Sequence, residues 1–201
     1  MFTSNSKIIK KSKEYVNELL VPLENHYYHE YSHALEVMDR AMYIGKKEWL
    51  SDEDIEILGI SWLFHDTWFI IQYEKNEIFW AKIAKNFLKS VLYPNDKIKK
   101  IEKIILATDI DYEPKNIYEK IIKDADLDSL WREDFFNKSD KLKLEIETIK
   151  NIKILDPDWQ HWSIVFLKKH RYFTETQKKE RKEKKEKNRK ILEKNLKNST
   201  K

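Results

Sequence analysis

Apolar residues recur along most of the chain at intervals of three and four, the period of an amphipathic helix. The first such segment, residues 6–21, ends before Pro22 and predicts a helix. Similar stripes predict a helix that carries Leu35 to Ile44, a helix over 74–92 and a helix over 98–108. The apolar side of the helix over 74–92 is expected to comprise Ile78, Phe79, Ala81, Ile83, Ala84, Phe87, Leu88 and Val91.

Helix-start signals sharpen the picture in the middle of the chain. Ser51 is followed by three acidic residues, a combination that favours a helix N-terminus, and the apolar stretch 55–64 predicts that this helix is buried. Shorter helices are expected over 114–122, 128–136, 139–151 and 158–170. From 174 to 197, basic residues alternate with glutamates, which predicts a solvated helix whose end Leu192 and Leu196 could attach to the bundle. No segment requires a strand, so we predict an all-α bundle of short to medium helices with a charged C-terminal helix.

The composition narrows both fold and function. A chain of 201 residues is long enough for one domain, which we place over 1–201 with its core over about 15–172. Two glycines and four prolines are too few for hairpin-rich sheets, and they exclude a glycine-rich phosphate loop. The absence of cysteine excludes disulfides, thiolate metal sites and cysteine nucleophiles.

The charge balance and the polar N-terminus bear on partners and location. The net charge of +4 is a small difference between 39 basic and 35 acidic residues, which is weak evidence for a polyanionic partner. The N-terminus lacks the apolar core of a signal peptide, and no apolar run has membrane-spanning length. We therefore expect a cytoplasmic protein with no membrane partner.

The most informative chemistry lies where the apolar run 55–64 ends in His65-Asp66. This pair brings a nitrogen donor and an anionic oxygen to the end of a buried helix, where an unpaired carboxylate would be costly. A divalent cation removes that cost, and mixed nitrogen and oxygen ligands suit Mn, Fe, Co, Ni or Zn. Three segments could supply one ion, since His33 lies upstream and the aspartates 124 and 126 lie downstream.

These residues carry a family resemblance. The motifs Y-H-x-Y-x-H at 28–33, F-H-D at 64–66 and D-A-D-L-D at 124–128 resemble, in order and spacing, the HD superfamily of metal-dependent phosphohydrolases. Further matches are Ile105-Leu106-Ala107-Thr108, Leu130-x-Arg132-x-Asp134-Phe135 and His170-Arg171-Tyr172-Phe173-Thr174. The resemblance covers roughly residues 15–197, and more specifically it points to a small subgroup of HD hydrolases.

The resemblance implies a ligand set for the metal. It places the ligands at His33, His65 and Asp66, with a last aspartate in the D-A-D stretch. The family's register there selects Asp126; Asp124 is the alternative and could be a partner of the ligands.

The resemblance also bears on the number of metal ions. Between Asp66 and Asp126 the chain has no histidine, and Asn76 stands where the subgroup often has one. We therefore expect one divalent ion, Mn, Fe, Co, Ni, Zn or Mg, rather than two. Glu77, which the subgroup retains, is expected to act as a general acid or base or to position water, although a solvated glutamate fits equally well.

The implied activity is hydrolysis of a phosphate ester, of a nucleotide or a small phosphorylated metabolite, by a metal-activated water. We expect Asp66, Glu77 and Arg132 to be catalytic. The expected substrate contacts are His29, Arg132 and Arg171. Aromatic residues that could stack a nucleobase, although a core role is favoured, are Trp62, Trp68, Phe69, Tyr73, Phe79 and Trp80.

Two other classes of function fit part of the sequence. The chain could be a degenerate HD module that binds a nucleotide or a protein partner without catalysis, but the intact metal set argues against this. It could also bind nucleic acid through the basic tail 178–190. Glutamates neutralise much of that tail, so we do not expect a nucleic-acid partner.

Overall fold

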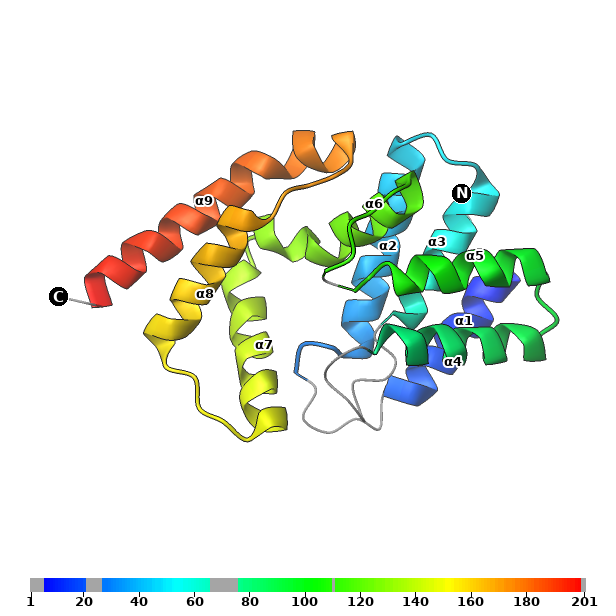
Figure 1. The fold of residues 1–201 in the computed structure, drawn as a ribbon, viewed down its shortest axis with the longest axis horizontal. Helices are drawn as coiled ribbons and strands as arrows, with labels where there is room; N and C mark the ends of the chain where they lie inside the picture. The colour runs from blue at the N-terminus through cyan, green and yellow to red at the C-terminus, as the bar shows by residue number, and fades with distance from the viewer. Residues whose placement is uncertain (1–5, 21–26, 66–75, 110, 200–201) are drawn as a thin grey trace.

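The computed structural model describes residues 6–20, 27–65, 76–109 and 111–199, and in these ranges it contains nine α-helices, one 3-10 helix and no strand (Figure 1). The helices are α1 (Lys7–Leu20), α2 (Tyr31–Lys47), α3 (Asp52–Phe64), α4 (Glu77–Ser90), α5 (Asn95–Leu106), α6 (Ile117–Asp126), η2 (Leu127–Trp131), α7 (Phe135–Lys150), α8 (Asp156–Lys169) and α9 (Glu175–Ser199). This confirms the predicted all-α class. In the described part of the chain, no helix is long and apolar enough to cross a membrane.

Helix α3 is the centre of the amino-terminal half. Ser51 caps it as predicted, because its hydroxyl accepts a hydrogen bond from the Asp54 N–H at 3.2 Å. Every residue of 57–64 is buried, so the helix is enclosed on all sides. α2 packs along it so closely that a Cβ on Gly59 would lie 2.9 Å from Met42 Sδ. The two helices that supply the predicted histidines are thereby fixed against each other.

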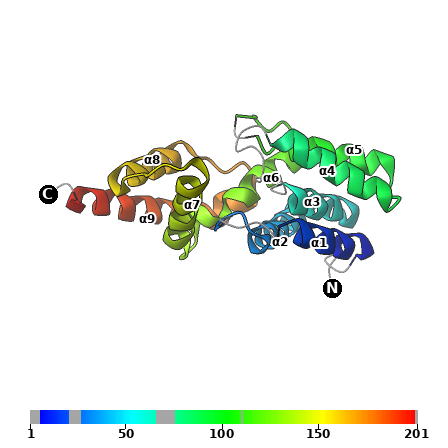
Figure 2. The same ribbon diagram turned by 90° about the horizontal axis from the view of Figure 1, so that it is seen from below.

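The carboxyl-terminal half is a separate group of helices beside this core. α7, α8 and α9 lie to one side of α1–α6 in two perpendicular views (Figures 1 and 2). Leu130 of η2 and buried apolar side chains of these three helices form a small second cluster, made of Leu130, Phe135, Ile164, Leu167 and Leu192. Leu192 is buried in this cluster and Leu196 packs against it, so both attach the charged helix α9 to the bundle, as the sequence suggested.

The predicted helix over 128–136 is wrong. The chain forms the short η2 there, becomes extended at Arg132, and starts α7 at Phe135, four residues before the expected 139. The side chain of Asn188 donates to the carbonyls of Leu130 and Arg132, at 2.9 and 3.1 Å. These carbonyls therefore bond to α9 instead of continuing a helix.

Two other helices, α6 and α4, differ from the bounds or the apolar face that the sequence predicted. α6 begins at Ile117, after the Asn116 cap, and it continues past the expected end at 122 to include Asp126. α4 begins at Glu77, and its first turn does not follow the expected apolar face, since Ile78 is 65% exposed and Phe79 is 41% exposed. Of the rest of that face, Ala81, Ala84 and Leu88 are buried as predicted, and Ile83, Phe87 and Val91 are partly buried.

Candidate metal centre

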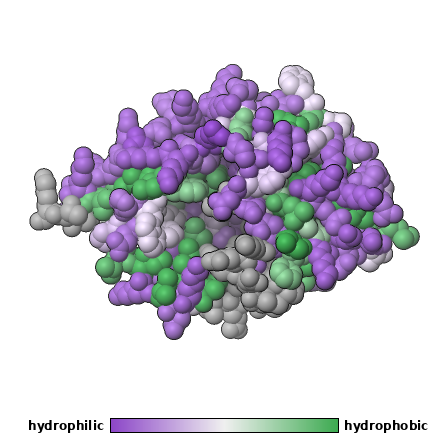
Figure 3. All heavy atoms as spheres, in the orientation of Figure 1, coloured by the Kyte–Doolittle hydropathy of each residue, from purple (hydrophilic) through white to green (hydrophobic). Residues whose placement is uncertain are grey.

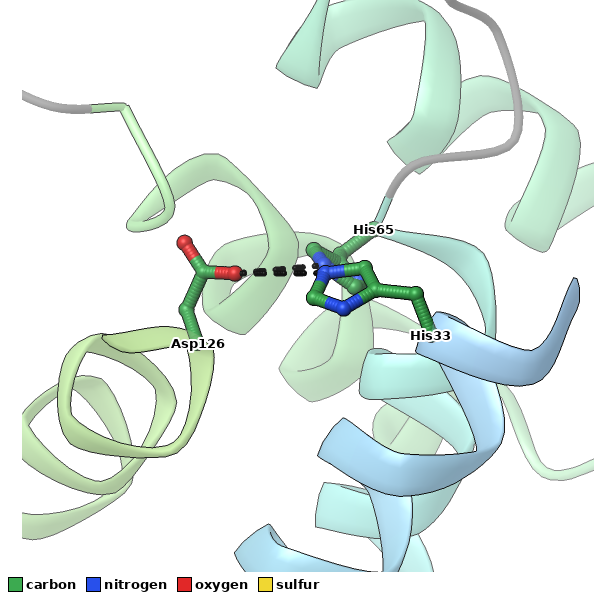
Figure 4. A group of neighbouring side chains, drawn as sticks. All are labelled: His33, His65 and Asp126. Carbon is green, nitrogen blue, oxygen red and sulfur yellow. Dashed lines mark ion pairs between the residues drawn. The ribbon is translucent and has the colours of Figure 1, made fainter. Parts of the chain in front are cut away.

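Three side chains from three helices meet at one point (Figure 4). His33 lies in the first turn of α2, His65 directly follows α3, and Asp126 ends α6. The distance to Asp126 Oδ1 is 3.8 Å from His33 Nε2 and 3.7 Å from His65 Nε2. One ligand atom from each residue lies within 4.8 Å of the others. The structure thus brings together three of the four residues that the sequence nominated as ligands.

A backbone contact determines the tautomer of His65. Its Nδ1 lies 2.6 Å from the carbonyl oxygen of Trp62. A carbonyl can only accept, so Nδ1 carries the hydrogen, and in the neutral ring Nε2 presents a lone pair toward Asp126. Metal-binding histidines are oriented by this type of contact. His65 is therefore held in the form that binds a cation.

The spacing and the charge of the cluster also fit a cation. Two donors bound to one ion at about 2.0–2.2 Å each lie about 3–4 Å apart, which covers both measured separations. Desolvation by itself would raise the pKa of Asp126, but the imidazoles of His33 and His65, when protonated in the metal-free protein, lower it well below the usual range. The cluster thus combines an anionic oxygen with two imidazole nitrogens whose rings are buried. This donor set fits a divalent transition metal.

The other two aspartates of the prediction have different outcomes. Asp66 lies outside the described residues. Asp124 is fully buried and faces away from the cluster, because its carboxylate accepts hydrogen bonds from the N–H groups of Phe173 and Thr174 and from the Thr174 hydroxyl, at 2.7 to 3.1 Å. Burial raises the pKa of Asp124 to about 6, although these hydrogen bonds act in the opposite direction. Asp124 attaches the start of α9 to α6.

A cleft of about 710 Å³ opens beside the cluster, with Asp126 on its wall. Its polar side includes His29 and Glu77, which the sequence predicted for the site, together with Thr108, Asp109 and Lys138. His29 also packs edge-on against the ring of His33, with centroids 5.8 Å apart. The cleft is therefore lined by Asp126 of the cluster, by the predicted catalytic residue Glu77 and by the predicted substrate contact His29.

The opposite side of the cleft is apolar and comes from the carboxyl-terminal half. Trp159, Trp162 and Phe166 of α8 line it, together with leucines from η2 and α7. Apolar side chains gather over α7 and α8 on the face shown in Figure 3. Trp162 is 57% exposed, and the Trp159 indole is oriented by a hydrogen bond to the Ser139 hydroxyl at 2.9 Å. We call these three rings the aromatic wall.

The aromatic residues that the sequence suggested for base stacking are mostly placed elsewhere. Trp62 is completely buried in the core, Phe79 is not among the lining residues, and Trp80 is buried except where it borders the cleft. Trp68, Phe69 and Tyr73 lie outside the described residues. The core interpretation of Trp62 was correct, and the aromatic wall was missed because its residues lie far from the histidine motifs in sequence.

The predicted arginines are not on the cleft wall. Arg132 borders a small recess beside His33 and Asp126, but its guanidinium is held by Asp134 and Glu36 at 2.6 to 2.9 Å. Arg171 is 70% exposed and pairs with Glu113. Lys138 borders both the recess and the cleft. Sequence reasoning missed Lys138, since nothing in the pattern separates it from the many solvated lysines.

Comparison with known proteins bears on the family and the fold. The model of the HD domain family matches residues 31–130, a range that contains all three residues of the cluster. The chain is an HD-domain protein. A solved structure of Bacillus subtilis YpgQ, in complex with ADP, has the same fold, with 18% identity and a TM-score of 0.64 over 92% of this chain and 93% of that one. No curated protein matches the chain. The HD match ends before α7 and α8, so the aromatic wall lies outside it.

Proposed function

We propose that this HD-domain protein is a metal-dependent hydrolase of phosphate esters. The observation that carries the proposal is the cluster of His33, His65 and Asp126 beside the cleft, with His65 held in its metal-binding tautomer. We assign these three residues, together with Asp66, as ligands of a single divalent ion. When bound, such an ion supplies a Lewis acid and a water molecule of lowered pKa.

The remaining polar residues of the cleft have roles around the substrate. We assign Glu77, at the first turn of α4, to accept or donate the proton of the attacking water. We assign Lys138 and His29, which line the same cleft, to contact phosphoryl oxygens, on which negative charge builds during transfer. Arg132 reaches the site from the recess side, and its two carboxylate partners make it a weaker electrostatic contributor than the sequence suggested.

The size and lining of the cleft favour a nucleotide as the substrate. Its volume of about 710 Å³ is in the range of sites for such ligands. The aromatic wall offers exposed ring faces on which a base can stack, while the metal cluster lies on the polar side. The presence of ADP in the structure of YpgQ supports this choice of ligand class.

The test compares two histidine variants. His65→Ala removes a ligand of the proposed ion, whereas His161→Ala removes an exposed histidine of α8 that does not line the cleft. Metal content and turnover of nucleotides and simple phosphate esters are measured with several divalent ions. We expect His65→Ala to lose the metal and lower turnover by at least about a hundredfold, and His161→Ala to match the wild type.

Two outcomes would contradict the proposal. If the wild-type protein holds no divalent ion and hydrolyses no phosphate ester, the proposed enzymatic function is ruled out. Wild-type protein that binds metal and a nucleotide without turnover would identify the non-catalytic HD module instead.

A further inference from the structure

A hydrogen bond joins α7 to the aromatic wall through a serine hydroxyl that does not close on its own helix. The indole Nε1–H of Trp159 donates to Oγ of Ser139 at 2.9 Å, and both side chains line the cleft. The hydroxyls of Ser61 and Thr148, which also lie within helices, donate instead to the carbonyl four residues earlier, at 2.8 and 2.7 Å. Among the described residues, Ser139 has no such bond to its own helix. Its oxygen is turned toward α8.

The Trp159 contact determines what the Ser139 hydroxyl can still do. A hydroxyl has one hydrogen and two lone pairs, whereas an indole N–H can only donate. Trp159 therefore occupies a lone pair of Oγ and leaves the hydroxyl hydrogen for another partner. No hydrogen bond donated by Ser139 is present in the described part of the chain. A ligand in the cleft can accept that hydrogen in place of water.

The exposed rings of α8 lie on one face of the helix. Trp159, Trp162 and Phe166 are spaced by three and four residues, which places them on the same side, and all three line the cleft. Ile164 and Leu167 hold the helix in the small second cluster. Trp162 is the most exposed of the three rings, at 57%. It offers the broadest surface on which a flat ring can stack.

We propose that Ser139 and Trp162 recognise the base of the substrate: the base stacks on Trp162, and the Ser139 hydroxyl donates to a nitrogen or oxygen acceptor at its edge. Trp159 is the positioning residue, because its N–H holds the Ser139 oxygen at the cleft wall. The inference rests on the proposed function for the nucleotide that brings the base. It also deepens that function, since it predicts that nucleotides are preferred to sugar phosphates, which have no flat ring.

Three phosphate esters separate the two contacts. Adenosine monophosphate (AMP) has a flat ring with acceptors at its edge, phenyl phosphate has a flat ring without them, and ribose 5-phosphate has no flat ring. Titration calorimetry on the full chain, after removal of divalent ions, measures binding without turnover. The kcat/KM values are then measured with the divalent ion that supports hydrolysis.

Ser139→Ala tests the edge contact. We expect it to weaken AMP binding by about 3- to 10-fold, the effect of one neutral hydrogen bond, and to lower kcat/KM for AMP by the same factor. Phenyl phosphate and ribose 5-phosphate should bind as they do to the wild type. If Ser139 served only to join α7 to α8, its loss would displace the rings and weaken AMP and phenyl phosphate together.

Trp162→Ala tests the stacking contact. Loss of an aromatic ring that stacks on a base should weaken AMP and phenyl phosphate by about 10-fold or more, and leave ribose 5-phosphate unchanged. Trp159→Phe keeps a ring but removes the N–H, so it should weaken AMP by less than Ser139→Ala does. If Ser139→Ala does not fold, Trp159→Phe tests the same contact.

Thr148→Val is the matched control, because it removes a hydroxyl from the same helix at an exposed position away from the cleft lining. It should match the wild type with all three esters. Circular dichroism establishes that each variant has the wild-type helix content.

The outcomes separate base recognition from the proposed function. Wild-type protein that binds AMP no more tightly than ribose 5-phosphate overturns the base site. An equal loss of AMP and phenyl phosphate binding in Ser139→Ala overturns the edge contact, and so does unchanged AMP binding in that variant. Wild-type protein that prefers AMP but hydrolyses no phosphate ester overturns the proposed function and supports the base site.

Discussion

The two halves of the molecule are stabilised in different ways. The amino-terminal half, α1 to α6, buries a large continuous apolar cluster that includes the whole of α3 from Ile57 to Phe64. The carboxyl-terminal half buries only five apolar residues in its own cluster. Directional polar contacts join it to the first half: Glu145 to His29, Asp124 to Thr174, and Arg40 to Asp128 and Glu180.

The two halves therefore contribute to the site in different ways. The rigid apolar half holds His33 and His65, whose positions a metal ion would demand. The polar contacts position the aromatic wall and α7 relative to them. Apolar burial is non-directional, whereas a buried hydrogen bond fixes an orientation and can be lost with one substitution. Single substitutions should therefore act on the two halves in different ways.

The largest expected effect is a cavity in the amino-terminal core. Leu58 is completely buried and contacts α2 at Gly45, so Leu58→Ala should lower the free energy of unfolding by about 3–5 kcal/mol. Leu192→Ala, in the small cluster, should cost about 2 kcal/mol or less, because its neighbours are fewer and the site can relax. Urea denaturation followed by circular dichroism measures both. Equal losses of unfolding free energy in the two variants would contradict the inference that the two halves are stabilised in different ways.

The second effect is a dependence on acid pH. The pKa of Glu145 is about 2 in the folded protein, against an ordinary value of 4.5, so the unfolded chain binds the proton more readily. The contribution to stability is complete above pH 4.5 and is lost as the pH falls toward 2, a total of about 3 kcal/mol. The stability difference between the wild type and Glu145→Gln should shrink over that interval. A difference that stays constant with pH would contradict the assignment.

A third, smaller effect concerns the attachment of α9. Asp124→Ala leaves the N–H groups of Phe173 and Thr174 without their acceptor, which should cost about 2 kcal/mol. Burial of the Asp124 carboxylate, which raises its pKa, costs free energy in the wild type. Removing the carboxylate removes that cost, which offsets part of the lost stability. Hydrogen exchange should accelerate in the first turns of α9 and remain slow in α3. Uniform acceleration across the chain would show that the two halves unfold as one unit.

The smallest effect is expected at Arg171. Its ion pair with Glu113 is exposed on both sides, and such pairs contribute less than about 1 kcal/mol. Arg171→Ala should therefore leave both stability and KM close to the wild-type values. A large rise in KM would restore the substrate-binding role that the sequence suggested for Arg171.

The sequence predicted the parts of the site that local pattern encodes. The Ser51 cap and the apolar run after it define α3, and hence the place of His65. The choice of Asp126 over Asp124 came from family register, and the structure places Asp126 beside the histidines while Asp124 contacts Thr174. The role of these residues as metal ligands stays a prediction until an ion is measured.

The missed features all depend on contacts between distant segments. Glu145 and Lys138 lie on α7 among ordinary charged residues, and their partners, His29 and Glu36, are about a hundred residues away in the sequence. The mistaken helix over 128–136 has the same origin, because Asn188 of α9 captures the carbonyls of Leu130 and Arg132. Helical periodicity reports which face is apolar, but it does not identify what a polar residue will contact.

The division of the cleft between the two halves also bears on how such proteins diversify. Residues 31–130, which match the family, contain the proposed reactive centre, whereas the aromatic wall lies on α8, beyond that range. Substitutions at Trp159, Trp162 or Phe166 can reshape the pocket without altering His33, His65 or Asp126. Descendants of one ancestor could thus inherit the same reaction while exchanging the molecules on which it is performed.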